Sequence, residues 1–287
     1  MKRLAYSFAI LSFLIFACTI PTTAIPSVAT LVPVTAAPVA SDTPNAPEPP
    51  TSTEPPVATE PPAPQANVTC HELTLFLDPA LATGVNCEIV PASTQGMEMN
   101  PQYTQLTLQG YLLFDRFFTA HISIYSVQDY ANLLPDNIPA DVAGLKALIG
   151  SGPTGNKGLP FLPNFNAGQE FFAGYKVISF GSGDGIRYLT QYSQYFDPIN
   201  NHELFYTFQG LTSDGKYWIS AILPISNPIL PADGNNPPNG QSQEEFGKNF
   251  TAYITDVTNQ LNAQAPENYS PTISTLDALV ASIRIQP

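Results

Sequence analysis

The feature that most constrains this fold is a sharp change in composition near residue 66. The first 66 of the 287 residues contain nearly half of the 30 prolines, together with an apolar N-terminal run. Proline fixes the backbone φ angle and removes a donor, so this segment cannot share a packed core with the rest of the chain. The sequence therefore predicts a single folded domain over residues 67–287, which is long enough to bury a full hydrophobic core.

Charged residues are sparse. They form 11% of the sequence, and 10 Lys and Arg against 23 Asp and Glu give a formal net charge of −13. Soluble proteins usually contain about 25% charged residues, so the polar surface here must come largely from Asn, Gln, Ser, Thr and Tyr. Because no basic patch is present to release counterions, binding to nucleic acid is excluded as a function class.

The N-terminus has the pattern of an export signal. Lys2 and Arg3 form a short basic segment, and the apolar run 4–17 follows directly. This run is shorter than the roughly 20 residues that a membrane-spanning helix needs. The pattern is typical of a secretory signal peptide.

Residues 15–18 (Ile-Phe-Ala-Cys), at the end of this signal, resemble the lipobox of bacterial lipoproteins, although Phe is bulkier than the residue usual at its position. The resemblance implies that Cys18 takes a diacylglyceryl group and becomes the first mature residue. The alternative is an ordinary secretory signal with Cys18 as a bystander. Acyl chains contribute about 0.8 kcal/mol per buried methylene, so two or three would hold the protein on the membrane. The predicted location is the cell envelope, on the outer face of the membrane.

Residues 19–66 are predicted to form a disordered tether. Pro, Thr, Ala, Ser and Val dominate the segment, and Glu-Pro-Pro recurs at positions 48, 54 and 60. Pro-rich linkers favour extended backbone and act as semi-rigid spacers. The alternative is a stalk with glycosylated Thr and Ser side chains.

The three cysteines are consistent with the same compartment. If Cys18 is lipidated, Cys70 and Cys87 remain as an even pair that can close a short loop, so we expect a disulfide. The competing interpretation is a metal or nucleophile site at Cys70 and His71. No metal-ligand spacing accompanies these two residues, which favours the disulfide.

Hydrophobic periodicity predicts an α+β domain with an antiparallel sheet of about six to seven strands and helices packed on it. Strands are expected over 71–77, 103–114, 119–126, 171–180, 186–195, 203–212, 216–225 and 283–285. Helices are expected over 127–134, 139–150 and 271–282, and a helix of about five turns is expected to begin within 241–245 and end near 261. Strands 103–114 and 119–126 should form a hairpin, burying Leu106, Leu108, Leu112, Phe114, Ala120, Ile122 and Ile124 and exposing His121, Ser123 and Tyr125.

This order of elements, and the ending 276–283 (Leu-Asp-Ala-Leu-Val-Ala-Ser-Ile), resemble the PsbP-like extrinsic proteins of photosystem II. The resemblance covers residues 103–285 in element order. It implies an α/β/α sandwich around an antiparallel sheet and a non-enzymatic binding or assembly role. No functional residue of that family can be placed on this chain.

No catalytic or metal-binding motif is found, and no cofactor is predicted. Residues 150–158 lack the spacing of a phosphate loop, and residues 181–183 (Gly-Ser-Gly) lie between two predicted strands rather than at the strand-to-helix elbow of hydrolases. Three histidines are too few for a convincing triad or zinc site. Turn chemistry explains three aspartates, with calcium binding as the alternative if they converge: Asp184, Asp197 and Asp214.

Aromatic residues in the second half offer the best candidate for a surface. Even-numbered aromatic positions within each strand share one side, and aliphatic residues of the same parity favour core packing. The alternative is a binding surface that stacks on sugars or anchors a partner. Its residues would be Tyr188, Tyr192, Tyr206 and Trp218, with Phe208 at the same parity.

Two main hypotheses follow. The first is a membrane-anchored extracytoplasmic lipoprotein whose domain is a non-catalytic module for an unknown protein, glycan or small ligand. The second is an envelope hydrolase in which folding brings together dispersed carboxylates, such as Asp115, Glu170 and Glu203. A purely structural surface protein is a third possibility. A cleft walled by loops 151–170 and 226–242, and its lining, would discriminate among them.

Overall fold

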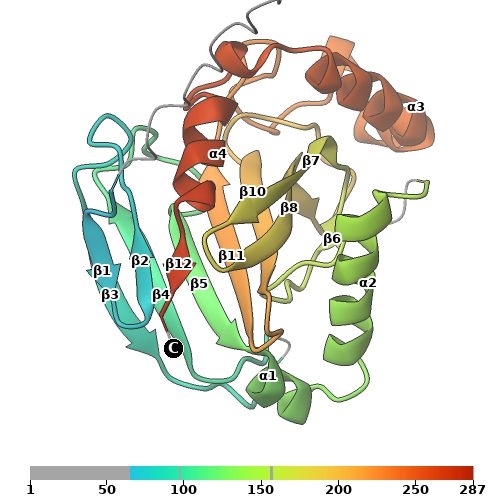
Figure 1. Cartoon of the computed structure of the whole chain (residues 1–287). Coiled ribbons are helices and arrows are strands. Elements are labelled where there is room, and N and C mark those ends of the chain that lie inside the picture. The colour runs from blue at the N-terminus through green and yellow to red at the C-terminus, as the bar shows by residue number, and fades with distance from the viewer. Residues whose placement is uncertain (1–64, 97, 156–157, 287) are drawn as a thin grey trace, which may run out of the picture. The chain divides into compact units, whose positions relative to one another are not determined.

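The computed structural model describes residues 65–96, 98–155 and 158–286. Within these residues the fold is α+β, and it is built on a seven-stranded antiparallel sheet (Figure 1). This confirms the predicted fold class and strand number. The signal segment, Cys18 and the tether up to residue 64 lie outside the described residues.

The large sheet has the strand order β3-β4-β5-β11-β10-β8-β7, and each neighbouring pair is antiparallel. Its strands are β3 (Gly84–Val90), β4 (Tyr103–Gln109), β5 (His121–Ser126), β7 (Ala173–Phe180), β8 (Gly183–Thr190), β10 (Phe205–Thr212) and β11 (Tyr217–Pro224). A three-stranded sheet consists of β1 (Val68–Cys70), β2 (Leu73–Leu75) and β12 (Arg284–Ile285). A short ribbon pairs β6 (Gly168–Gln169) with β9 (Tyr192–Ser193).

The described helices are α1 (Val127–Leu133), α2 (Ile138–Ser151), α3 (Gln243–Asn262) and α4 (Ile273–Ala281), with 3-10 turns η1 (Pro238–Gly240) and η2 (Pro266–Asn268). The α3 helix illustrates how local sequence sets an element. Ser242 and Glu245 form a reciprocal capping box at its start, and Phe246, Phe250, Val257 and Leu261 form its buried stripe. None of the described helices combines the length and apolarity needed to cross a lipid bilayer.

Both faces of the large sheet are covered. On one face the core includes residues of the small sheet, α3 and α4, and on the other it includes residues of α1, α2 and segment 159–162. In Figure 1, α4 and β12 lie in front of the large sheet, and α2 lies beside it. Ser123 and Tyr125, which alternation assigned to solvent, are therefore buried beneath the second layer.

The coverage of both faces also decides whether the aromatic residues of the strands form the core or a binding surface. Tyr188, Tyr206, Phe208 and Trp218 are fully buried, so they are core residues and not a binding surface. The register places Tyr188 and Trp218 on the α2 side of the sheet, and Tyr206 and Phe208 on the α4 side. Even residue numbers in two different strands therefore do not place the side chains on the same face of the sheet.

A polar contact fixes α4 on the sheet. The Asp277 carboxylate accepts hydrogen bonds from Arg187 Nε at 3.2 Å, Lys176 Nζ at 3.0 Å and Tyr206 Oη at 3.1 Å. Arg187 and Tyr206 are buried residues of the sheet, so the carboxylate both satisfies them and positions the helix.

Two strand predictions need correction. Strand 103–114 ends at Gln109, because Gly110 turns the chain with a φ of 59°, and Leu112 and Phe114 are exposed. Strand β3 was not predicted, although it forms one edge of the large sheet. The predicted hairpin of residues 103–114 and 119–126 is present as β4 and β5.

Cys70 and Cys87 form a disulfide that joins β1 of the small sheet to β3 of the large one. This excludes a free thiol or metal site at Cys70 in this structure. At residues 181–183 the chain makes the β7–β8 turn, where Ser182 Oγ accepts a hydrogen bond from Ile285 N at 2.8 Å. Ser182 therefore has a structural partner.

Candidate functional site

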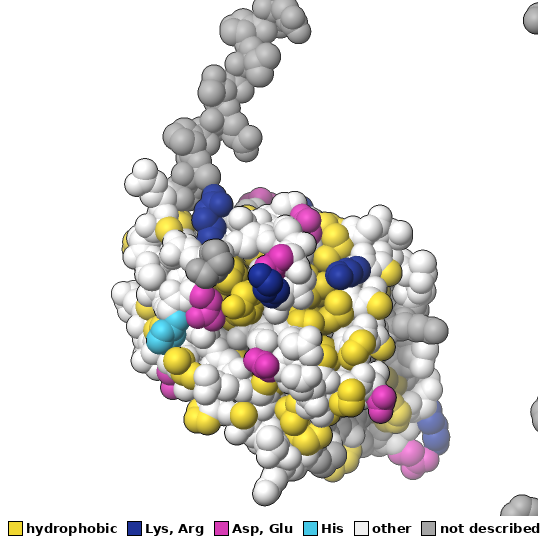
Figure 2. Space-filling model, turned by 60° about the horizontal axis from the view of Figure 1, so that its bottom comes forward, with side chains coloured by type: hydrophobic (Ala, Val, Ile, Leu, Met, Phe, Trp, Pro, Cys, Tyr) yellow, Lys and Arg dark blue, Asp and Glu magenta, His cyan; other side chains and the backbone are white. Residues whose placement is uncertain are grey.

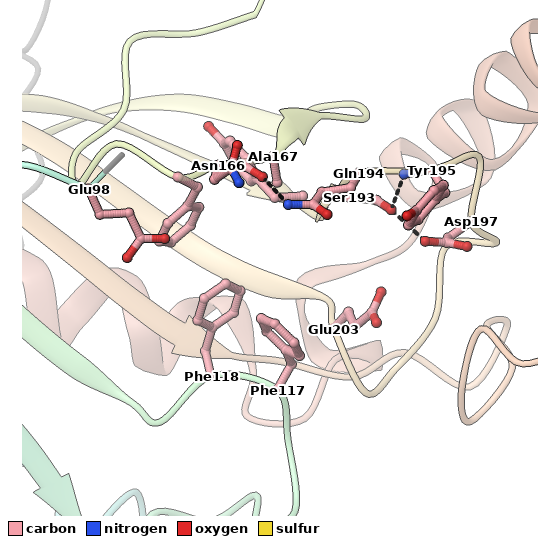
Figure 3. Close-up of a pocket in the computed structure, with 12 residues that line it drawn as sticks. Glu98, Phe117, Phe118, Asn166, Ala167, Ser193, Gln194, Tyr195, Asp197 and Glu203 are labelled. Carbon is pink, nitrogen blue, oxygen red and sulfur yellow. Dashed lines mark hydrogen bonds between the residues drawn. The ribbon is translucent and has the colours of Figure 1, made fainter. Parts of the chain in front are cut away.

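A cavity of about 600 Å³, here called the aromatic cavity, lies among loops at one end of β10 and β5 (Figure 3). Four separate segments contribute to it. Its lining residues are Glu98, Phe117, Phe118, Phe165, Asn166, Ala167, Tyr192, Ser193, Gln194, Tyr195, Asp197 and Glu203. Ligand sites typically have volumes of about 300–1,000 Å³, so the aromatic cavity is large enough for a small molecule.

Packed aromatic rings form one side of the cavity. Phe118 and Phe165 are stacked with centroids 5.2 Å apart, and Tyr192 meets Phe165 edge-on at 5.2 Å. Phe161 and Phe205 lie behind them, with centroids 5.1 Å from Phe165 and 4.9 Å from Phe118, respectively. Such a cluster offers a rigid apolar surface.

A loop segment, residues 158–167, brings Phe165 to this place; we call it the strap. The buried side chain of Gln209 fixes it, because Oε1 accepts from Leu162 N at 3.1 Å and from Trp218 Nε1 at 2.7 Å. Ser220 Oγ adds a hydrogen bond to the Leu162 carbonyl at 2.5 Å. The far end of the strap continues into β6, which pairs with β9. The strap is thus held at Leu162, near its middle, and at its C-terminal end.

The opposite side of the cavity is acidic. Asp197 accepts a hydrogen bond from Ser193 Oγ at 2.5 Å, and Glu203 accepts one from Asn200 Nδ2 at 3.2 Å. Asn200 is fully buried, and its backbone N–H donates to the buried Gln191 side chain at 3.1 Å. This buried amide pair positions the loop that presents both carboxylates.

A second cavity of about 830 Å³, here called the outer cavity, shares the strap and the 193–195 segment with the first. Glu170 lines it. Partial burial raises the pKa of Glu170 to about 7, and the negative charge of Asp197 adds to this effect. Glu170 therefore changes charge near neutral pH.

This raised pKa predicts a specific pH dependence of stability. A carboxyl group whose pKa is higher in the folded than in the unfolded state stabilises the fold fully below its unfolded pKa of about 4.3, and this contribution is lost as pH rises through about 7. The variant Glu170→Gln should therefore match the wild type near about pH 4 and have a higher melting temperature near about pH 8. Calorimetry across this range checks it, with the exposed Glu267→Gln as control. Equal shifts in the two variants would contradict the prediction.

The cavity does not contain the hydrogen bonds of a nucleophilic triad. Ser193 Oγ donates directly to Asp197 and accepts from Tyr195 N at 3.0 Å, and no histidine lines the aromatic cavity among the described residues. His202 lines a neighbouring cavity with Asp197 and Glu203, but its Nδ1 lies 3.2 Å from the Asp115 carbonyl. A triad requires the base to bond the nucleophile.

The sequence-predicted residues are only partly brought together. Tyr192 alone of the four surface candidates lines the cavity. Glu203 and Asp197 line the aromatic cavity and Glu170 lines the outer one, whereas Asp115 lines neither. Asp214 bonds Thr212 within its turn and Asp184 bonds Ser179. No group of three or more His, Cys, Asp or Glu that could hold a metal is found in the part of the chain that the structure describes.

Of the two loops whose position was to discriminate among the hypotheses, one walls the aromatic cavity. Loop 151–170 supplies one wall of the aromatic cavity through the strap, whereas loop 226–242 does not line it and instead contributes residues 233–235 to the neighbouring cavity of Asp197 and Glu203. Residues 117–118 and 192–197 complete the aromatic cavity instead. Sequence reasoning missed Phe117, Phe118 and Phe165; the only available signal was the placement of aromatic residues in loops, where a core role is less common.

The distribution of surface charge agrees with the exclusion of nucleic-acid binding that the composition indicated. On the face shown in Figure 2, Lys and Arg side chains stand apart from one another among polar and hydrophobic groups, without a basic cluster.

Comparison with known proteins gives no match: no family model, no curated protein and no solved structure matches the chain.

Proposed function

We propose that this protein is a lipid-anchored lipoprotein of the cell envelope whose domain binds a ligand in the aromatic cavity without transforming it. The observation that supports binding is the cavity itself, a concave site with a packed aromatic side and a few polar groups opposite, as small-ligand sites have. The membrane part of the proposal rests on the signal and lipobox-like residues, followed by a Pro-rich tether. The disulfide supports export, because such bonds persist mainly in oxidising compartments.

The anchor is tested by changing the processing site. Combining Ile15→Ala with Cys18→Ser removes the thiol and leaves the small-x-small pattern of an ordinary secretory signal. We expect the product to leave the membrane fraction, with about a tenfold or greater fall in membrane-bound protein, because no acyl chain remains. Cell fractionation and immunoblotting measure this, with Thr19→Ser as control. Membrane retention of the double variant would contradict the anchor.

A second candidate function, an envelope glycan hydrolase, is favoured by one observation. Glu170 has a pKa of about 7, raised by burial and by the charge of Asp197, as a general acid beside an ionised carboxylate would have. Incubation of purified protein with cell-wall glycan oligomers separates the two functions. The proposed binder leaves the oligomers intact, whereas products that disappear in Glu170→Gln and Asp197→Asn would identify a hydrolase.

A further inference from the structure

The charged side chains that line the aromatic cavity are all acidic. Glu98, Asp197 and Glu203 are acids, and no Lys, Arg or His lines it among the described residues; Lys157 lies outside them. The ion pairs of the described chain involve other acids, namely Asp214, Glu244 and Asp277. None of the three carboxylates that line the cavity is in an ion pair among the described residues.

The carboxylates flank the rings. Figure 3 shows Glu98 at one end of the cavity and Asp197 with Glu203 at the other, with Phe117 and Phe118 below the space between them. The ring face of an aromatic residue carries negative charge density and attracts a cation within about 6 Å of its centroid. Rings and carboxylates thus favour the same kind of ligand by two independent mechanisms.

The combination discriminates among ligand classes. An anion would be repelled by all three carboxylates, and a neutral apolar ligand would remove water from them without compensation, which is costly. A bare metal ion gains little from phenyl rings and prefers several oxygen ligands in close array. An ammonium group on an apolar body satisfies both surfaces.

We propose that the aromatic cavity binds a small organic cation, with an ammonium group between the carboxylates and the rings. This inference rests on the proposed binding function and specifies its ligand class. In the adjoining outer cavity, burial raises the pKa of Glu170, and the negative charge of Asp197 adds to the shift.

The test is equilibrium dialysis of the detergent-solubilised full-length protein against radiolabelled choline. Its neutral isostere, 3,3-dimethyl-1-butanol, serves as a competitor of the same shape. We expect saturable choline binding at one site and competition by the isostere that is weaker by about tenfold or more, because the isostere lacks the charge.

Two variants locate the site. Glu203→Gln and Asp197→Asn keep side-chain shape and should each lower choline affinity by about tenfold, since each removes one charge facing the ligand. The exposed Glu267→Gln changes net charge equally and should leave affinity unchanged. Circular dichroism confirms that each variant is folded.

Other outcomes have defined meanings. Absence of saturable choline binding, or equal affinity in the wild type and Glu203→Gln, would overturn the cation inference. If the wild type then binds neutral cell-wall glycan oligomers and the variant Tyr192→Ala does not, the proposed binding function stands without the cation. If it binds neither, both proposals fall.

Discussion

Replacing Gln209 by alanine is expected to lower the free energy of unfolding by about 3–5 kcal/mol, because two buried donors lose their acceptor at once. Those donors are the indole N–H of Trp218 and the backbone N–H of Leu162. Both Trp218 and Gln209 are fully buried, so water cannot replace the lost carbonyl without entering the core. Urea denaturation of the wild type and the variant measures the difference.

The same substitution should also impair the cavity. Gln209 anchors the strap at Leu162, and the strap presents Phe161 and Phe165 to the other rings. We therefore expect Gln209→Ala to weaken choline binding even at temperatures where the variant remains folded. The exposed Gln260→Ala on α3 is the matched control and should change stability by less than about 0.5 kcal/mol. A loss below about 1 kcal/mol for Gln209→Ala would contradict the role assigned to this side chain.

The second large effect concerns the disulfide. Cys70 and Cys87 are 17 residues apart, and closing a loop of about this size stabilises a fold by about 3 kcal/mol in the chain-entropy account. The double variant Cys70→Ala with Cys87→Ala should lose this amount in urea denaturation. The loss should concern the β3 edge first, because β3 pairs with β4 alone in the large sheet.

Reduction supplies the internal control. Dithiothreitol should destabilise the wild type by a similar amount and leave the double variant unchanged, since only the wild type has a bond to reduce. A wild type that is as stable reduced as oxidised would show that the bond contributes nothing to the fold. Hydrogen exchange at β3 amides would then have no reason to differ between the two forms.

Local sequence patterns predicted the elements well where one rule decided them. The start and length of α3, and the glycine-containing turn between β7 and β8, follow directly from residue spacing. Strand β3 was not predicted because its side chains are half-buried or exposed, which is the pattern of an edge strand and not of clean alternation. Strand alternation alone did not indicate the second covering layer, which only the expected α/β/α sandwich included, because alternation is the same whether one face of a sheet is covered or both.

The cavity was less accessible to prediction than the fold. Its side chains come from a loop before β4, the segment before β5, the strap, and β9 with the loop that follows it. The sequence of one of these segments does not indicate that the others lie near it, since their proximity depends on the sheet register and on buried contacts such as that of Asn200 with Gln191. Asp197, assigned from sequence to an ordinary turn, thus lines the cavity beside Ser193.

We propose that the ligand-binding domain is held outside the cytosol by a lipid anchor, and mass spectrometry of the native N-terminal peptide tests this proposal. The proposal predicts a mature chain that begins at Cys18 and carries the added mass of a diacylglyceryl group. Recovery of the chain from the cytosol with residues 1–17 still attached and Cys18 unmodified would contradict it.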